Sequence, residues 1–427
     1  MLTSQQSVQA DSVDSMMDTS QPAISCGEAI STSRNYGDVI QHPVRCAPIL
    51  QRIPKNARVC VANLLLKLIN DILQHPTSST CWSRLLGFPS ACLAKPARGG
   101  KSRNLTSGII KQVQLYEAGT NQSTVAPTRY HRAVQRRPVR TPEQQIAAMA
   151  AAKLEDGDVK GAVRLLCSDD KLAIVNATTM NELSRLHPST PADRRPVPSI
   201  VVPPLQVFPS ALRTAIQSFP NGSAGGPDGL RPQHLKDLML GASDDHPLLV
   251  AITDLTNLQL EGHTPSSVRS TLFGATLLAI HKKTGGIRPI AVGYVWRRLT
   301  AKVSCCHVKE ASATLLAPRQ LGFGIAGGAE AAVRAARRYV ENMNQGQVFV
   351  KIDFKNAFNT LRRDSILEAV AMYFPELLAF AQSTMDQESV LQFGDFVLQS
   401  AEGAQQGDPL SPLYFCLAFK ELLESQL

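Results

Sequence analysis

The segment VFVKIDFKNAFNTL, residues 348–361, decides how the C-terminal half of the chain is interpreted. It opens with an apolar, partly β-branched run that ends at Asp353, and a polar cluster follows directly. Such a run favours a β-strand. A carboxylate at the end of a strand either caps the next turn through its backbone N–H groups or holds a metal ion. Asp353 alone leaves both interpretations open.

Composition indicates a globular protein with a preference for polyanions. The chain has 427 residues, of which 44% are hydrophobic, so it is long enough for two or three domains with their own cores. Lys and Arg total 44 against 35 Asp and Glu, a formal net charge of +9. This excess favours a partner such as nucleic acid, although a basic protein without such a partner would have the same composition.

Cysteine usage and hydropathy place limits on the class of protein. The nine cysteines include no CxxC pair, and the histidines complete no zinc-ligand spacing. We therefore expect free thiols in a reducing, intracellular compartment. No secretory signal is present at the N-terminus, and charged or polar residues interrupt the apolar run of residues 61–73. The sequence predicts no membrane span.

The chain divides by composition into six parts. We predict a disordered N-terminus at residues 1–45, a helical module at 46–115, a basic linker at 116–140, a helical hairpin at 141–187, a Pro-rich linker or draped arm at 188–209 and a mixed α/β region at 210–427. The basic linker carries Arg129, Arg132, Arg136, Arg137 and Arg140. These arginines suit phosphate contact, and a solvated linker is an equal alternative.

The mixed α/β region contains several recognisable elements. Residues 276–292, TLLAIHKKTGGIRPIAV, predict a β-hairpin with Lys282, Lys283 and Arg288 near its tip. Residues 327–342 predict a helix, the strand ending at Asp353 follows, and Ser365 with Glu368 predicts a capping box for the next helix. Residues 404–419, AQQGDPLSPLYFCLAF, predict a tight turn that enters a buried helix. Each element taken singly is also explained as structure alone.

Their order is more specific. A Gly-Pro-Asp-Gly loop precedes the basic hairpin, and a Gly-Phe-Gly turn, the Asp353 segment and Gln-Gly-Asp-Pro follow in turn. This succession resembles the reverse transcriptases of non-LTR retrotransposons over roughly residues 200–427. The resemblance implies a right-hand polymerase fold, with the fingers and part of the palm in residues 210–427.

The resemblance also implies roles for individual residues. Asp353 matches the first palm carboxylate, which binds Mg²⁺ or Mn²⁺, with the backbone carbonyl of Phe354 as a neighbouring ligand. Phe358 matches the bulky residue beneath the incoming sugar, which favours deoxynucleotides. The remaining matches are Lys282 or Lys283 and Arg288 for the triphosphate, Gln406 and Gly407 for the nucleotide and template, and Arg231 as a weak nucleic-acid contact.

The sequence departs from this family at one decisive point. An aromatic-x-Asp-Asp hairpin is expected after the Gln-Gly segment, but the sequence ends at Leu427. Its two Asp-Asp pairs, Asp169-Asp170 and Asp244-Asp245, lie upstream of Asp353 and are expected in loops. One carboxylate cannot hold two magnesium ions, so we expect this chain alone not to polymerise DNA.

We therefore interpret the chain as a fragment of an RNA-directed DNA polymerase from a retroelement. Its expected partners are an RNA template, a DNA primer and dNTPs. The alternative is a non-catalytic nucleic-acid-binding remnant of a retroelement protein. The arginine-rich stretch is compatible with nuclear import, but such runs are unspecific. Oligomeric state and insertion target cannot be read from the sequence.

Overall fold

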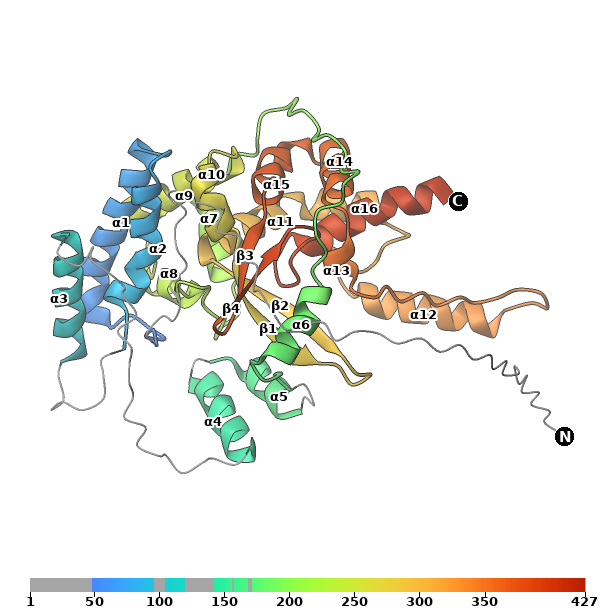
Figure 1. Cartoon of the computed structure of the whole chain (residues 1–427), viewed down its shortest axis with the longest axis horizontal. Coiled ribbons are helices and arrows are strands. Elements are labelled where there is room, and N and C mark those ends of the chain that lie inside the picture. The colour runs from blue at the N-terminus through green and yellow to red at the C-terminus, as the bar shows by residue number, and fades with distance from the viewer. Residues whose placement is uncertain (1–47, 96–103, 120–141, 156, 168–170, 427) are drawn as a thin grey trace, which may run out of the picture. The chain divides into compact units, whose positions relative to one another are not determined.

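The computed structural model describes residues 48–95, 104–119, 142–155, 157–167 and 171–426 (Figure 1). The predicted disordered N-terminus and the five arginines of the predicted basic linker lie outside these residues. The boundaries proposed from composition stay predictions. Within the described residues, the elements are those expected of a mixed α/β protein.

The N-terminal module is helical. It comprises the 3-10 turn η1 (Lys55–Ala57) and the helices α1 (Arg58–Gln74), α2 (Ser79–Cys92) and α3 (Leu105–Glu117). One face of α1 is buried, and its apolar residues there are Val61, Leu64, Leu65, Leu68, Ile69 and Ile72. Each such side chain contributes about 2 kcal/mol on burial, so packing rather than propensity holds this helix. α1 packs against α9 (Pro247–Leu260) of the C-terminal region.

Two short helices and an extended segment lead from this module to the sheet. α4 (Pro142–Glu155) and α5 (Val159–Cys167) pack together, with Gly157 at a φ of +74° between them. The chain then runs along the edge of β1 (Ala275–His281), where Ala173 N donates to Ala279 O at 2.8 Å. α6 (Ala177–Arg185) follows, and its Leu183 joins the small core on the sheet.

The sheet has four strands in the order β2-β1-β3-β4. β1 and β2 (Ile287–Gly293) form the predicted basic hairpin, with His281 paired to Ile287 next to the turn. β3 (Ser389–Phe393) runs parallel to β1 and antiparallel to β4 (Phe396–Ser400). This second hairpin was not predicted from the sequence. It places the Gln-Gly loop directly after a strand that shares a sheet with the basic hairpin.

Helices surround this sheet and form the main core. They are α7 (Pro209–Gln217), α8 (Pro232–Leu238), α9, α10 (Ser266–Leu272), α11 (Val295–Leu316), α14 (Arg363–Tyr373), the 3-10 turn η2 (Pro375–Leu377), α15 (Leu378–Met385) and α16 (Ser411–Gln426). One continuous apolar cluster joins residues of α1, α2 and α3 to residues of these helices. The expected mixed α/β region preceded by helices is confirmed.

The Pro-rich segment is not a free linker. Residues 188–207, here called the strap, are hydrogen-bonded to α14 and α15 through Arg194, Arg195 and Pro198, and to η2 through Leu205. Arg195 N donates to Asp364 Oδ2 at 3.0 Å, Gln382 donates to Pro198 O at 2.6 Å, and Leu205 N donates to Glu376 O at 2.9 Å. Proline lacks a backbone N–H donor, so side chains take part in most of the strap's connections.

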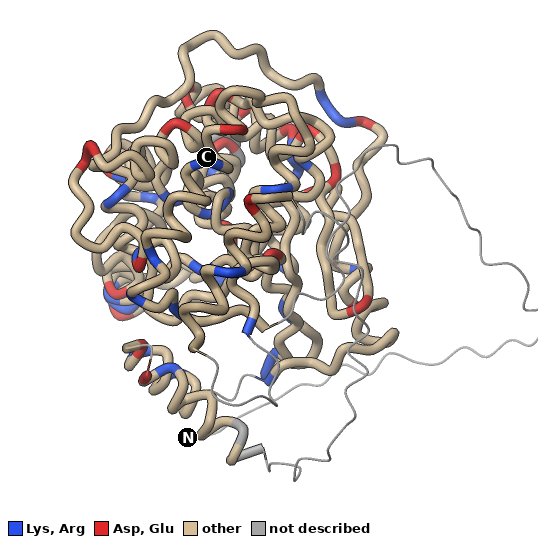
Figure 2. Tube along the Cα trace, turned by 90° about the vertical axis from the view of Figure 1, so that its left-hand side faces the viewer, with Lys and Arg blue, Asp and Glu red and all other residues tan. Residues whose placement is uncertain are grey.

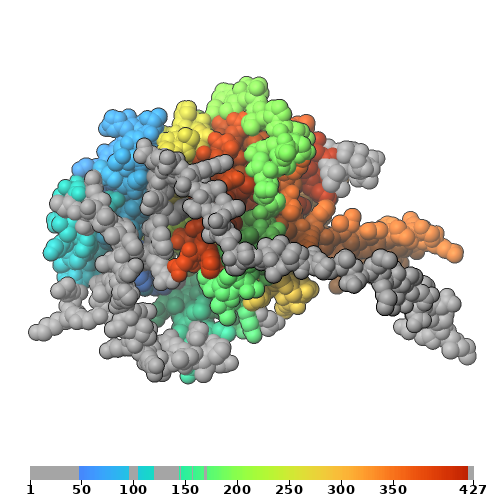
Figure 3. Space-filling model, in the orientation of Figure 1, coloured from blue at the N-terminus to red at the C-terminus, as the bar shows by residue number. Residues whose placement is uncertain are grey.

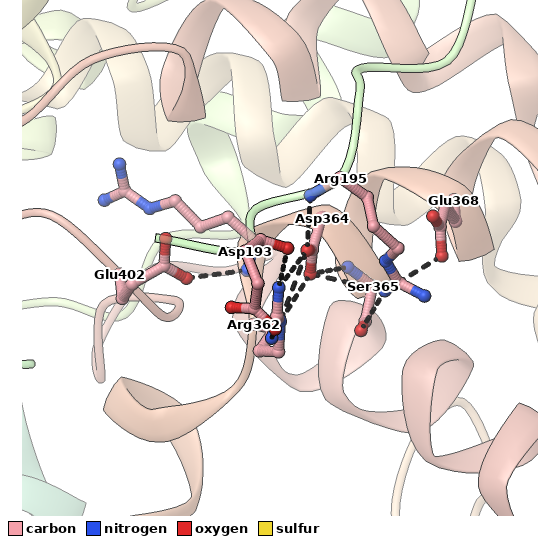
Figure 4. A network of polar contacts seen from close by, with 8 residues as sticks. Asp193, Arg195, Arg362, Asp364, Ser365, Glu368 and Glu402 are labelled. Atoms are coloured by element: carbon pink, nitrogen blue, oxygen red, sulfur yellow. Dashed lines mark hydrogen bonds and ion pairs between the residues drawn. The ribbon is translucent and has the colours of Figure 1, made fainter. Parts of the chain in front are cut away.

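A charged network fixes the strap to α14 (Figure 4). Asp364 is buried and accepts from Arg362 and Arg195, and Arg362 also bonds Asp193 at 2.9 Å. The predicted Ser365–Glu368 capping box is wrong. α14 begins at Arg363, so both residues lie inside the helix, where Ser365 Oγ and Glu368 instead accept from Arg195.

The segment around Asp353 is not a strand. α12 (Gly328–Glu341) and residues 342–354, together called the arm, are exposed almost throughout, and α12 projects from the surface (Figure 3). Val348, Val350 and Ile352 are 74%, 70% and 73% exposed. The predicted strand over 348–353 is therefore wrong for this structure. A strand needs a hydrogen-bonded neighbour, and none of the described residues pairs with this segment.

The distribution of charged residues, the hydropathy of the helices and the state of the cysteines can each be compared with the sequence predictions. Basic and acidic positions are interspersed through the described helices and loops (Figure 2). None of the described helices has the length and apolar character needed to cross a bilayer. Within the same part of the chain the cysteines are free thiols, as expected.

Candidate nucleotide-binding site

A tight turn presents Phe358. Asn356 adopts a left-handed conformation with a φ of +58°, which asparagine tolerates better than most residues. Its Nδ2 donates to Leu186 O at 2.7 Å, so the turn is tied to the end of α6. The short helix α13 (Ala357–Thr360) follows and carries Phe358. The sequence Lys-Asn-Ala-Phe thus forms a fixed turn.

Phe358 belongs to a cluster of four aromatic rings. Phe415 of α16 lies at the centre, with ring centroids 5.8 Å from Phe358, 6.1 Å from Phe354 and 5.7 Å from Phe419. Phe354 and Phe419 meet edge to face at 5.3 Å. Such pairs contribute about 1 kcal/mol each beyond their buried area. The helix that follows the Gln-Gly loop therefore supports both phenylalanines singled out from the sequence.

The loop of residues 401–410 contacts the Phe358 turn through its backbone. Ala404 N donates to Phe358 O at 2.9 Å. Gly403 has a φ of +71°, and a Cβ there would lie 2.4 Å from Asn359 O. Only glycine allows the two backbones to approach this closely.

The same loop contacts the basic hairpin. Ala291 N of β2 donates to Gln406 O at 2.7 Å. Gly407 has a φ of +124°, and a Cβ there would lie 2.4 Å from Ala291 O. Gln406 and Gly407 are therefore brought together with the hairpin that carries Lys282, Lys283 and Arg288, as the resemblance implies. The hairpin cations themselves are exposed near its tip.

Buried polar residues that sequence reasoning missed hold the loop in place. Gln405 donates to Phe273 O at 2.9 Å and accepts from Arg297 Nη1 at 2.8 Å. Arg297, near the start of α11, also pairs with Asp408 at 2.8 Å. Asp408 Oδ1 accepts from Leu410 N at 2.9 Å just before α16. The sequence feature that points to this buried support is a charged residue, Arg297, inside the largely apolar run GYVWRRL.

Arg363 provides a second buried support. Its guanidinium donates to Ser400 O at 2.8 Å, Gln387 O at 3.1 Å and Gly403 O at 3.3 Å, and its backbone N donates to Glu402 Oε2 at 2.9 Å. Burial lowers the pKa of Arg363 to about 10. It ties α14 to the end of β4 and to the loop, so the loop is anchored at several separate points.

Asp353 lies outside this hydrogen-bonded arrangement. It is exposed on the irregular segment just before the Asn356 turn, while Phe354 reaches the aromatic cluster. Nowhere in the described residues do three or more His, Cys, Asp or Glu side chains come together as a metal site. Asp244 pairs with Arg213 at 2.8 Å in a loop, and Asp169 and Asp170 lie outside the described residues.

The Gly-Pro-Asp-Gly loop is a buried structural element. Asp228 Oδ1 accepts from Leu230 N at 3.1 Å, and burial raises the pKa of Asp228 to about 7. Arg231 precedes α8 and is partly exposed. His234 Nε2 lies 2.8 Å from Leu50 O, and burial lowers the pKa of His234 to about 4. This loop therefore joins the N-terminal module to the C-terminal region.

Comparison with known proteins matches the C-terminal part of the chain to a known family. Residues 280–427 match the family described as reverse transcriptase (RNA-dependent DNA polymerase). The chain is also 24% identical over 246 residues to the retrotransposable element SLACS 132 kDa protein of Trypanosoma brucei gambiense. That alignment covers 56% of this chain and 20% of the relative, so the chain spans about a fifth of the relative's length.

Proposed function

Because residues 280–427 carry an RNA-directed DNA polymerase domain of retrotransposon type, we propose that the chain binds the incoming nucleotide for DNA synthesis on an RNA template. The observation that carries this proposal is the double attachment of the loop at residues 401–410. It is bonded to the Phe358 turn through Ala404 and to the basic hairpin through Gln406. Three segments distant in sequence thereby meet, and this supports the proposal.

The proposed roles follow from side-chain chemistry. Lys282, Lys283 and Arg288 attract the triphosphate, and a guanidinium at position 288 can bind two phosphate oxygens at once. Gln406 and Gly407 contact the base or the template strand. Phe358, supported by the Phe415 ring, forms a rigid wall that excludes a 2′-hydroxyl. Rigid support is needed because a mobile ring would yield to the additional oxygen.

The family is dependent on divalent metal ions, and Asp353 with the Phe354 carbonyl is the proposed contribution of this chain. The described residues do not by themselves form a metal site, so no catalytic step is assigned to a metal here. RNA template, DNA primer and dNTP are the proposed substrates.

Nucleotide selection by a longer polypeptide tests the proposal. Residues 1–427 would be continued with a hairpin that bears two adjacent aspartates, and extension of a primed RNA template would be measured with dNTPs or rNTPs. We expect Asp353→Asn to abolish extension. We expect Phe358→Ala to shift the ratio of kcat/KM values towards rNTPs by roughly tenfold or more, because removing a steric wall admits the 2′-hydroxyl.

Phe349→Ala is the matched control, since Phe349 is an exposed phenylalanine of the arm outside the four-ring cluster. It should leave sugar selection unchanged. Equal selectivity in the wild type and the Phe358 variant would remove Phe358 from its proposed role. Extension that survives Asp353→Asn would remove Asp353.

A further inference from the structure

Three cations surround Phe219 at the end of α7. Lys302 Nζ lies 5.0 Å from the centroid of the Phe219 ring, and the guanidinium carbon of Arg298 lies 5.5 Å from it. Lys236 of α8 donates to Phe219 O at 2.5 Å. Lys236, Arg298 and Lys302 are here called the Phe219 cation cluster. They come from two helices, and all three are partly exposed.

The carboxylates of the described residues form no ion pair with this cluster. Lys236 and Arg298 donate to backbone carbonyls, those of Phe219 and Ala224. Among the residues that the structure describes, no carboxylate lies within ion-pair distance of the three cations. The buried carboxylates of the same region are already paired, Asp408 with Arg297 at 2.8 Å and Asp237 with Arg58 at 3.3 Å.

Holding these cations together is unfavourable for the free protein. Burial is the main cause that lowers the pKa of Lys236, and the neighbouring charges of Lys302 and Arg52 lower it further. The attraction of Lys302 and Arg298 to the ring face offsets only part of this, about 1 kcal/mol per pair. A bound anion would relieve the remaining repulsion, so the cluster favours a polyanionic ligand.

The cluster adjoins the candidate nucleotide site. Arg298 follows Arg297 on α11, and Arg297 holds Gln405 and Asp408 of the loop. The negative charge of Asp408 acts on Arg298 as well. Phe219 lies beneath the cations and is buried, so it is not available to stack on a base. Contacts here would therefore be to phosphates and independent of sequence.

We propose that the Phe219 cation cluster binds backbone phosphates of the single-stranded template as it approaches the loop at residues 401–410. The identification of the strand as the template rests on the proposed function. The binding itself depends only on the three cations and can be measured without nucleotides or synthesis.

Equilibrium binding of a labelled single-stranded RNA to the full chain, over a series of salt concentrations, tests the proposal. Lys236→Gln and Lys302→Gln should each weaken binding several-fold at low salt. Each should also reduce the slope of log K against log salt concentration by about 0.7, the value for one lost phosphate contact on a single strand. Lys302→Arg should retain both the affinity and the slope, because it keeps the charge.

Lys111→Gln is the matched control, an exposed lysine on α3 of the N-terminal module. It should change neither quantity. Thermal unfolding of each variant shows whether it is folded, and Lys302 serves if the Lys236 variant fails, since Lys236 also bonds the buried Phe219 residue. Unchanged slopes in folded cluster variants, no RNA binding at all, or equal losses in Lys111→Gln would overturn the proposal.

Two further arms separate this inference from the function proposed above. Duplex RNA should compete less well than the single strand, and equal competition would refute the assignment to a single strand. If primer extension shows normal sugar selection but the cluster variants bind RNA as the wild type does, the proposal for the Phe219 cation cluster is wrong and the proposed function stands. Conversely, if RNA binding depends on the cluster but nucleotide selection does not depend on Phe358, the proposal for the cluster stands and the proposed nucleotide site is wrong.

Discussion

The arm and the segment that follows it differ sharply although they adjoin in sequence. Between residues 328 and 354 the side chains are exposed almost throughout, including a strongly apolar run. Between residues 363 and 410 most side chains are buried, and Arg363 and Asp364 make several hydrogen bonds each. Both regions contain sequence patterns that predict regular secondary structure. The difference shows that partners, rather than propensity, decide which segment becomes fixed.

The largest expected effect is that of Asp364→Asn. The Asp364 side chain is 1% exposed and lies between Arg362 and Arg195. The substitution removes the buried charge that these two guanidinium groups share, and it weakens the attachment of the strap. Because both guanidinium groups are partly exposed, we expect the free energy of unfolding to fall by about 3 kcal/mol. Urea unfolding followed by circular dichroism measures this change.

Asp353→Asn in the exposed arm is the control, with an expected change within about 0.5 kcal/mol. Comparable losses in both variants would show that the two regions do not differ in the way described.

Gly403→Ala should have the next largest effect. A Cβ at this position would lie 2.4 Å from the backbone of Asn359, in addition to the cost of its φ of +71°. We expect a loss of about 2–3 kcal/mol in the free energy of unfolding. Gly346→Ala in the arm is matched to it, since Gly346 also has a positive φ of +93° but no neighbouring atom within 4 Å.

The arm variant should therefore cost only about 1 kcal/mol. If thermal or urea unfolding gave equal losses for the two glycines, close backbone contact at Gly403 would be disproved.

Acid should destabilise the buried region selectively. Burial opposes ionisation of Asp364, but hydrogen bonds from Arg362 and Arg195 outweigh it and hold the pKa of Asp364 well below its usual range. A lowered carboxyl pKa gives stability that is present above the unfolded value, near 4, and is lost as pH falls through the folded value. We expect Asp364 to account for about 1 kcal/mol of the loss between neutral pH and pH ~3, because only about one pH unit separates that pH from the unfolded value.

Unfolding measured across this range in the wild type and in Asp364→Asn isolates that contribution. His234 and Asp228 titrate in the same range with opposite signs. The lowered pKa of His234 removes stability as pH falls towards about 4, whereas the raised pKa of Asp228 removes stability as pH rises towards about 7. Both are present in the two proteins and cancel in the difference. Parallel pH profiles would exclude Asp364 as a source of acid sensitivity.

The smallest effect is expected for Ile352→Thr in the arm. Its side chain is 73% exposed, so little apolar contact is lost, and the free energy of unfolding should change by less than about 0.5 kcal/mol. Differential scanning calorimetry measures the shift. A loss above 1 kcal/mol would mean that Ile352 is buried in solution. The arm would then not be exposed in the way described.

These contrasts explain what the sequence could and could not predict. The β1–β2 hairpin follows from two alternating strands around Lys-Thr-Gly-Gly, and α12 follows from its own sequence pattern, in which Glu330 and Arg334 form an i,i+4 ion pair. The order of motifs indicated a reverse transcriptase domain, which the comparisons confirm.

The strand over 348–353 was predicted from composition alone, and it fails because strand formation requires a second strand. Arg297, Gln405 and Arg363 were missed for a related reason. Their function depends on carbonyls and side chains far away in sequence, such as Phe273 O and Ser400 O, and no local pattern reveals such pairing. The residues proposed for nucleotide binding stay predictions in their roles, although the loop, the Phe358 turn and the hairpin do meet.

The strap has a practical consequence for how the protein can be handled. Because the strap is hydrogen-bonded to α14, α15 and η2, a single proteolytic nick there would not release either half. Contacts such as Ile53 N to Asp237 and Ala173 N to Ala279 O would still join the two pieces. The chain should therefore be reconstitutable from two separately expressed polypeptides split within the strap, which would allow isotope labelling of one half at a time.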